Sequence, residues 1–310
     1  MQYLNEAYKK VYRAYKMGID IGSTTVKVVL TDDRNEMVFN RYRRHFSEIK
    51  KTVKDILKEA KEEFGNISFS AMITGSGGVA LANVLGVGFI QEVVATANAV
   101  EATAPQTEVA IELGGEDAKI IYFEGGNVEQ RMNGVCAGGT GSFIDQMASL
   151  LQTDAAGLNE LAKQYETIYP IASRCGVFAK TDIQPLINEG ARKEDLAASI
   201  FQAVVNQTIA GLACGKPIRG HVAFLGGPLH FLTELKAAFV RTLKLTEETT
   251  VDPENSHLFA AMGAALETKA ETTVSINNMI ETLAHGVEMP FELKRMEPLF
   301  ANEAEYLAFC

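Results

Sequence analysis

The alternation of apolar and polar positions changes period several times along the chain. Residues 17–31 form two apolar runs around a Gly-Ser-Thr-Thr turn, which predicts a β-hairpin. Residues 36–45 supply another strand, and apolar positions within 47–64 recur at helical spacing. A strand over 70–74 ends in a glycine-rich run, and we expect a helix over 91–104 after it.

The pattern then restarts. Strands are expected over 109–113 and 118–123, separated by a Gly-Gly-Glu-Asp turn, and a further turn follows at 124–127. Each half of the chain therefore opens with a hairpin that has a glycine-rich tip. We interpret this as a diverged internal duplication, and the alternation of helices with strands predicts the α/β class.

The remaining chain is mostly helical over 142–214. A buried strand over 221–225 then leads through Gly-Gly-Pro into helices over 229–243 and 257–269. Residues 271–310 show no strong period and suggest a fragment of a longer protein or a linker to another domain. We expect an N-terminal extension over 1–16, domains over 17–105 and 106–270, and a tail over 271–310.

Composition argues against a membrane-spanning, a secreted and a nucleic-acid-binding protein. No run of 18 apolar residues predicts a membrane-spanning helix, and residues 1–16 lack the apolar core of a signal peptide. Four widely spaced cysteines do not resemble a disulfide framework, so a reducing, cytoplasmic location is the default. The formal charge of −10 disfavours nucleic acid as a partner.

The first hairpin carries residues suited to phosphate. Gly22 lets the backbone come close, and Ser23, Thr24 and Thr25 offer hydroxyl and N–H donors. Asp20 is suited to Mg²⁺, directly or through water, and Lys27 adds a positive charge. A plain hairpin turn explains the glycine and the hydroxyls, but it explains an aspartate inside an apolar strand less well.

Two further turns are candidates. In the second hairpin, Gly114 and Gly115 open backbone room, Glu116 or Asp117 could orient water on Mg²⁺, and Lys119 follows. The run 226–228, Gly226-Gly227-Pro228, would let a flat ring pack on the backbone. Each is equally compatible with an ordinary turn. The chain has neither a Walker A motif nor a Rossmann glycine fingerprint.

Cys136 and Cys175 form the other candidate site. Each is followed by an apparent helix start, in the capping-box-like patterns Ser142-x-x-Asp145 and Thr181-x-x-Gln184. A helix N-terminus favours a thiolate and an anionic centre such as a [4Fe-4S] cluster.

Two ligands per chain would require a symmetric dimer with the cluster on its axis. The alternative is two ordinary cysteines. We interpret Cys214 as a small core residue, and Cys310 lies in the tail.

The ordered trio of turns resembles the phosphate-1, phosphate-2 and adenosine motifs of the actin/sugar kinase/Hsp70 (ASKHA) superfamily, and residues 260–265 resemble its second connecting helix. The resemblance implies two duplicated RNase H-like domains with ATP in the cleft between them. It implies ATP contacts at these residues: Gly22, Ser23, Thr24, Thr25, Lys27, Gly114, Gly115, Lys119, Gly226, Gly227 and Pro228.

Together with the segments Cys136-Ala-Gly-Gly-Thr-Gly-Ser-Phe and Ser-Arg-Cys175-Gly-Val-Phe-Ala, residues 17–270 resemble the activators of 2-hydroxyacyl-CoA dehydratases and the ATPase subunits of benzoyl-CoA reductases. The resemblance implies a homodimer in which Cys136 and Cys175 of both subunits hold one [4Fe-4S] cluster. It also implies ATP/ADP and Mg²⁺, ferredoxin or flavodoxin as electron donor, and an iron–sulfur dehydratase or reductase as acceptor.

The catalytic group would be Asp20, Glu116 and Asp117, with Asp20 and Asp117 acting on Mg²⁺ and its waters. Glu116 departs from the family, whose simplest members have glutamine there, and Pro228-Leu-His230 departs from the usual adenosine ending. The extension and tail suggest a large, multi-domain relative. The rival hypotheses are a small-molecule kinase of the same fold and a non-redox ATP-binding module of a larger protein.

Overall fold

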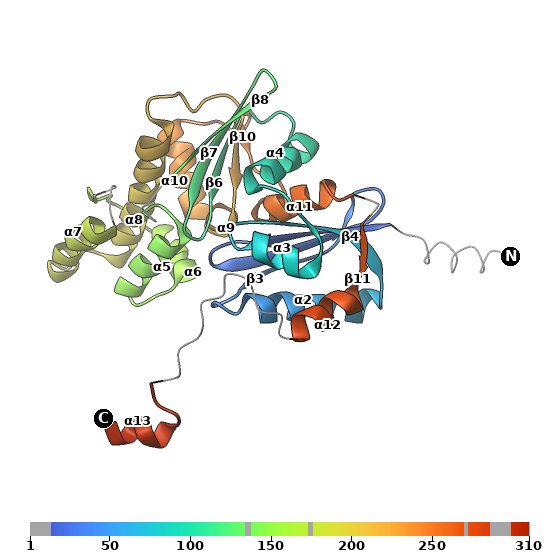
Figure 1. Ribbon diagram of the computed structural model, residues 1–310. Coiled ribbons are helices and arrows are strands. Elements are labelled where there is room, and N and C mark those ends of the chain that lie inside the picture. The colour runs from blue at the N-terminus through green and yellow to red at the C-terminus, as the bar shows by residue number, and fades with distance from the viewer. Residues whose placement is uncertain (1–13, 134–137, 173–175, 270–271, 286–298, 310) are drawn as a thin grey trace.

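The computed structural model describes residues 14–133, 138–172, 176–269, 272–285 and 299–309. In this part of the chain, two β-sheets each carry their own helices, and two helices lie between the sheets (Figure 1). We call the elements built on the first sheet the first domain and those built on the second sheet the second domain.

The first sheet begins as an antiparallel meander of β1 (Tyr15–Ile21), β2 (Thr25–Thr31) and β3 (Met37–Arg44). The strand β4 (Ser68–Thr74) then pairs parallel to β1, and β5 (Gly88–Phe89) pairs parallel to β4.

The second sheet repeats this plan. β6 (Val109–Leu113), β7 (Ala118–Glu124) and β8 (Asn127–Met132) form the meander. β9 (Val222–Leu225) pairs parallel to β6, and β10 (Thr250–Val251) pairs parallel to β9. The shared strand order confirms the predicted duplication.

The first sheet is covered by helices from both ends of the chain. α2 (Ile49–Phe64) and α12 (Ile276–Ala284) lie side by side on one face, and α3 (Gly78–Leu85) packs close to them (Figure 1). α2 is amphipathic and buries Val53, Ile56 and Leu57 against the sheet, as its period predicts.

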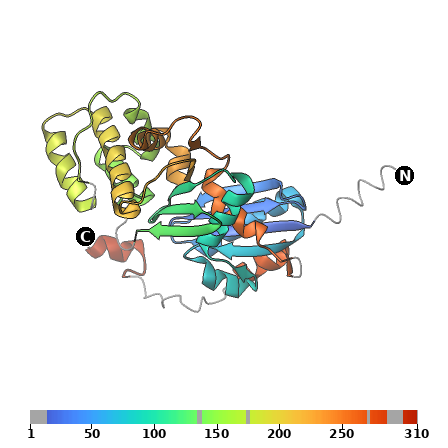
Figure 2. The same cartoon turned by 90° about the horizontal axis from the view of Figure 1, so that it is seen from above.

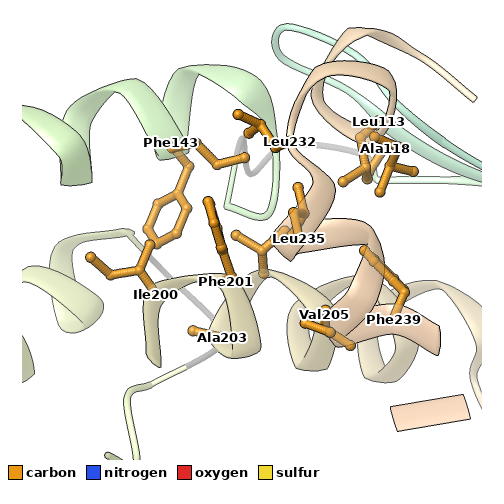
Figure 3. Packing of buried hydrophobic residues seen from close by; sticks show 14 of the residues in the cluster. Leu113, Ala118, Phe143, Ile200, Phe201, Ala203, Val205, Leu232, Leu235 and Phe239 are labelled. Atoms are coloured by element: carbon orange, nitrogen blue, oxygen red, sulfur yellow. The ribbon is translucent and has the colours of Figure 1, made fainter. Parts of the chain in front are cut away.

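The second domain contains most of the remaining helices, which gather on the side of the molecule opposite to the N-terminus (Figure 2). They are α5 (Gly141–Leu150), α6 (Ala155–Ala162), α7 (Gly176–Asn188), α8 (Lys193–Thr208), α9 (Gly227–Phe231) and α10 (Thr233–Leu243). α8 continues as a π-helical turn, η1 (Ile209–Ala213). Phe143 of α5, Phe201 of α8 and Phe239 of α10 belong to one core (Figure 3).

Residues 193–213 form a helix that is long and apolar enough to span a membrane by length and composition. About two thirds of it (67%) is buried inside the second domain. Its apolar character is therefore explained by its place in the core.

The helices between the sheets are α4 (Glu92–Thr103) and α11 (Phe259–Leu266), which follows the short turn η2 (Ser256–Leu258). They meet at a glycine: a Cβ on Gly263 would lie 1.7 Å from the carbonyl oxygen of Ala95. A Cβ on Gly18 of β1 would likewise lie 1.8 Å from the carbonyl oxygen of Ala261. Backbones approach this closely only without side chains, so these glycines set the spacing of the connecting helices.

The expected tail or linker over 271–310 is wrong for residues 273–284, which belong to the first domain. β11 (Thr273–Ser275) pairs antiparallel to β4 at the edge of the first sheet, and α12 buries Ile276, Met279 and Leu283 in the first core. The separate helix α13 (Glu303–Phe309) is exposed along its described residues.

Two smaller expectations are also wrong. The helix expected over 229–243 is interrupted at Leu232, where the backbone is extended. Cys214 is not a core residue: it is exposed and ends the π-helical turn in a left-handed conformation (φ 46°).

The two predicted capping boxes are also wrong. Ser142 and Thr181 lie inside α5 and α7, because both helices begin earlier, at Gly141 and Gly176.

Candidate active site

The two hairpin tips and the turn after β9 line one cavity of about 510 Å³ between the sheets. The structure brings nearly all of the predicted residues to its wall: Asp20, Gly22, Ser23, Thr24, Thr25, Lys27, Gly114, Gly115, Glu116, Asp117, Lys119, Gly226 and Gly227. Pro228 does not line it. Pro228 lies in the first turn of α9, close to the start of α5: a Cβ on Gly141 would lie 3.4 Å from Pro228 Cγ.

The tips of the two hairpins touch. Gly22 N–H donates to the carbonyl of Thr25, and Gly114 N–H donates to the carbonyl of Asp117, so each turn is closed by its own hydrogen bond. A Cβ on Gly115 would lie 2.2 Å from the hydroxyl of Thr24. Glycine at 115 therefore allows the tips to meet.

The duplication extends to the chemistry of the hairpins. Asp20 faces Lys27 across the first hairpin, and Glu112 faces Lys119 across the second. Each pair places an acid on the incoming strand and a lysine on the returning strand. Two lysines are thereby placed at one cavity, each paired with a carboxylate.

Asp20 and Lys27 form a buried ion pair. Lys27 Nζ donates to Asp20 Oδ2 at 2.6 Å, and the aspartate is fully buried. Burial alone would lower the pKa of Lys27, but the charge and hydrogen bond of Asp20 outweigh it and raise the pKa above its ordinary value. Lys27 is therefore a permanent cation at the cavity wall.

Lys119 sits among three carboxylates. Its Nζ lies 2.6 Å from Asp117 Oδ2, 2.7 Å from Glu92 Oε1 and 3.6 Å from Glu112 Oε1. Its pKa is well above the ordinary value, since these charges outweigh the opposing effect of burial. Lys119 thus joins the second hairpin to the first turn of α4.

Glu92 is a site residue that the sequence analysis missed. Burial, and then the charge of Asp20, raise the pKa of Glu92 to about 7, although Lys119 opposes the shift. Burial raises the pKa of Glu112 in the same way. Glu92 is the first residue of α4, and an acid in the first turn of a mostly apolar helix was the signal that could have revealed it.

The carboxylates fit a divalent cation. Among the residues that the structure describes, Asp20 Oδ1 and Glu112 Oε2 are buried without a hydrogen-bond partner. Buried carboxylate oxygens are normally satisfied, and oxygen is the ligand that Mg²⁺ prefers. No group of three or more His, Cys, Asp or Glu in the described residues forms a direct metal cage. The arrangement therefore suits Mg²⁺ held largely through water.

Glu92 should make stability depend on pH. A carboxyl whose pKa rises from 4.5 to about 7 on folding binds its proton more tightly in the folded state. Glu92 therefore stabilises the folded state fully below about pH 4.5, and this stabilisation is lost as the pH rises through 7. We expect Glu92→Gln to remove about 1–3 kcal/mol of this pH-dependent change in the free energy of unfolding. Urea titrations from pH 4.5 to 8 measure it. Glu101→Gln, an exposed position on the same helix, should leave the slope intact, and an unchanged slope in Glu92→Gln would refute the prediction.

The turn after β9 forms the other end of the cavity. Gly226 has φ 88°, and a Cβ there would lie 2.1 Å from the carbonyl oxygen of Leu113. His257 lines this end and stacks on His230, with ring centroids 3.9 Å apart. Burial and then His230 lower the pKa of His257 to about 4, so its ring is neutral at pH 7. Tyr42 and His257 were both missed by the sequence analysis, because they come from distant segments.

The predicted ligands Cys136 and Cys175 lie outside the described residues, but their flanks meet. Gly138, Gly139, Ala172 and Gly176 line one small hollow with Phe143. The start of α5 is fixed to the cavity, because Gly141 N–H and Ser142 N–H donate to the carbonyls of Gly114 and Gly115 at 2.9 and 2.8 Å. The helix that follows the Cys136 segment is therefore bonded directly to the second hairpin tip.

Known proteins resemble the chain over most of its length. The model of a family described as the BadF/BadG/BcrA/BcrD ATPase family matches residues 17–268. The (R)-2-hydroxyglutaryl-CoA dehydratase activating ATPase of Acidaminococcus fermentans is 30% identical over 217 residues, 69% of this chain and 82% of that protein. The 2-hydroxyisocaproyl-CoA dehydratase activator of Clostridioides difficile is 27% identical over 269 residues, 81% of this chain and 94% of that protein.

A solved structure of an activator component has a fold similar to that of this chain. The crystal structure of component A of the A. fermentans (R)-2-hydroxyglutaryl-CoA dehydratase has a TM-score of 0.72 and 28% identity, covering 84% of this chain and all (100%) of that one. This likeness, with the duplicated sheets, confirms the predicted actin/sugar kinase/Hsp70-like fold.

Proposed function

Because this chain belongs to the BadF/BadG/BcrA/BcrD ATPase family, we propose that it is an ATP-driven activator that delivers single electrons at low potential to a dehydratase- or reductase-type iron–sulfur partner. The observation that carries the proposal is the direct bond between the nucleotide cavity and α5. Through it, a movement of the second hairpin tip would be passed to the start of α5, which follows Cys136 in the sequence.

The nucleotide is proposed to bind in the cavity between the domains. Lys27 and Lys119 and the backbone N–H groups of the hairpin tips would hold the phosphates, and the turn at Gly226 and Gly227 would face the nucleoside. An activator structure with bound ADPNP, from Clostridium difficile, has the same fold as this chain, with a TM-score of 0.72 at 24% identity over 92% of this chain and all (100%) of that one.

Asp20 and Asp117 are proposed to hold Mg²⁺ through its waters, which would supply charge neutralisation at the phosphates. Glu92, Glu116 and Asp117 line the cavity wall near Lys119 and are the candidates for orienting the attacking water. Glu116 is exposed and Asp117 is paired with Lys119, whereas the raised pKa of Glu92 suits it to exchange a proton near pH 7.

A [4Fe-4S] cluster would be held by Cys136 and Cys175 of two subunits in a homodimer, and it would supply a store for one electron. The convergence of the flanking residues on one hollow supports two ligands from one chain. The first turns of α5 and α7 lie close together there, because a Cβ on Gly176 would lie 3.3 Å from the Phe143 ring. Ferredoxin or flavodoxin as donor, and a cytoplasmic location, belong to the same proposal.

The test is anaerobic purification followed by iron and sulfide analysis and EPR after dithionite reduction. We expect about four irons per dimer in the parent, none in Cys136→Ala, and an unchanged content in Cys214→Ala. Cys214 is a suitable control because it is exposed and lies in a different segment. A parent that stays free of iron after anaerobic reconstitution would rule out the electron-transfer function.

A further inference from the structure

The edge strand β3 extends two side chains from the first domain to the second. Tyr42 and Arg44 are two residues apart and therefore share one face of the strand. The Tyr42 ring meets Phe231 and His257 at centroid distances of 5.5 and 5.4 Å. Arg44 pairs with Asp145 of α5 at 2.7 Å. One strand thus reaches both the nucleoside turn and the helix after the Cys136 segment.

The contact of Tyr42 with the nucleoside turn is close. A Cβ on Gly227 would lie 2.2 Å from the Tyr42 hydroxyl oxygen and 3.0 Å from its Cζ. Gly226 is constrained differently, by its positive φ and the backbone of Leu113. Of these two glycines, only Gly227 is therefore required by a side chain of the other domain.

The Arg44–Asp145 pair suits a contact that forms and breaks. The side chains of Arg44 and Asp145 are 52% and 36% exposed, and exposed pairs contribute only about 0.2–1 kcal/mol. The same helix is held from within its own domain by the carbonyls of Gly114 and Gly115. α5 is consequently hydrogen-bonded to the second hairpin tip and ion-paired with Arg44 of β3.

We propose that β3 helps to close the nucleotide site. In this proposal Tyr42 and Arg44 are positioning residues that hold the second domain against β3 when nucleotide is bound. The inference rests on the proposed function, since it assigns these residues to ATP binding. It follows that closure over the nucleoside and the position of α5 are coupled through one strand.

The Arg44–Asp145 pair is tested by exchanging the charges of its two residues. Arg44→Glu and Asp145→Arg should each raise the KM for ATP about two- to fivefold with little change in kcat, and the double variant should return KM toward the parent value. Lys163→Glu, which breaks the exposed pair with Glu160 at the end of α6, should leave KM unchanged. A double variant whose KM change equals the product of the two single changes would overturn the role of Arg44.

The tyrosine is tested by a steric cycle in the same assay. Gly227→Ala should raise KM, and Tyr42→Phe should partly restore it by removing the closest contact. Gly226→Ala should not be restored, because its clash is with backbone. Thermal unfolding checks that each variant folds. A parent protein that neither binds nor hydrolyses ATP would refute the proposed function. Normal hydrolysis by the parent, with no coupling in either mutant cycle, would refute only the role of β3 in closing the site.

Discussion

Asp20→Asn is expected to lower kcat for ATP hydrolysis by about 10²–10³-fold while ADP still binds. Removing one preorganised charge from a site that stabilises transferring phosphate typically costs this much. The side chain retains its size, and Lys27 then loses its partner and becomes free to meet phosphate. The substitution removes the carboxylate charge that Asp20 Oδ1, which is buried without a hydrogen-bond partner among the described residues, shares with Oδ2.

Steady-state hydrolysis and calorimetric ADP binding measure the two effects separately. Asp32→Asn is the matched control, because Asp32 is a buried acid of the same domain that accepts from the backbone of Arg34 and Glu36 and does not line the cavity. It should reduce stability without a comparable loss of kcat. Parent-like hydrolysis in Asp20→Asn would exclude Asp20 from the catalytic group.

Lys119→Met is expected to destabilise the fold by about 3–5 kcal/mol at pH 8, because it leaves buried carboxylates without their cation. Lys119 is 2% exposed and contacts Glu92, Glu112 and Asp117. The loss should shrink toward pH 5, where Glu92, whose pKa is about 7, is protonated and no longer repels the neighbouring carboxylates. Burial raises the pKa of Glu112 in the same direction. Adding Glu92→Gln to Lys119→Met should recover part of the lost stability.

Denaturant unfolding at pH 5 and pH 8 checks this. Lys216→Met is the control. Lys216 also lies between two carboxylates, but Glu124 and Glu129 are exposed, so the expected cost is below about 1 kcal/mol. Equal losses in the two variants, or a loss independent of pH, would show that burial of the charges does not govern the stability of this site.

The sequence predicted the hairpins because their signal is local. Asp20 and Lys27 lie within one short segment, and their pairing follows from strand register once the turn is placed. Glu112 and Lys119 follow the same rule. The capping boxes failed because pattern alone does not fix where a helix begins: α5 starts where Gly141 bonds to the second hairpin tip, a tertiary contact.

The rest of the site depends on packing between segments far apart in the chain. Tyr42, Glu92 and His257 come from β3, α4 and η2, and no local period connects them. Cys214 was misjudged for the opposite reason. Its apolar neighbours suggest a core helix, but the helix ends there in a left-handed turn that exposes the thiol.

The return of β11 and α12 to the first sheet affects how the protein is made. During synthesis, the first domain emerges with residues 68–70 of β4 still lacking their β11 partners, and with the core positions of Ile276 and Met279 unfilled. The whole second domain must leave the ribosome before those residues arrive. We therefore infer that the second domain completes its fold first, and that a nascent chain halted before residue 273 exposes a strand edge available to chaperones or to other chains.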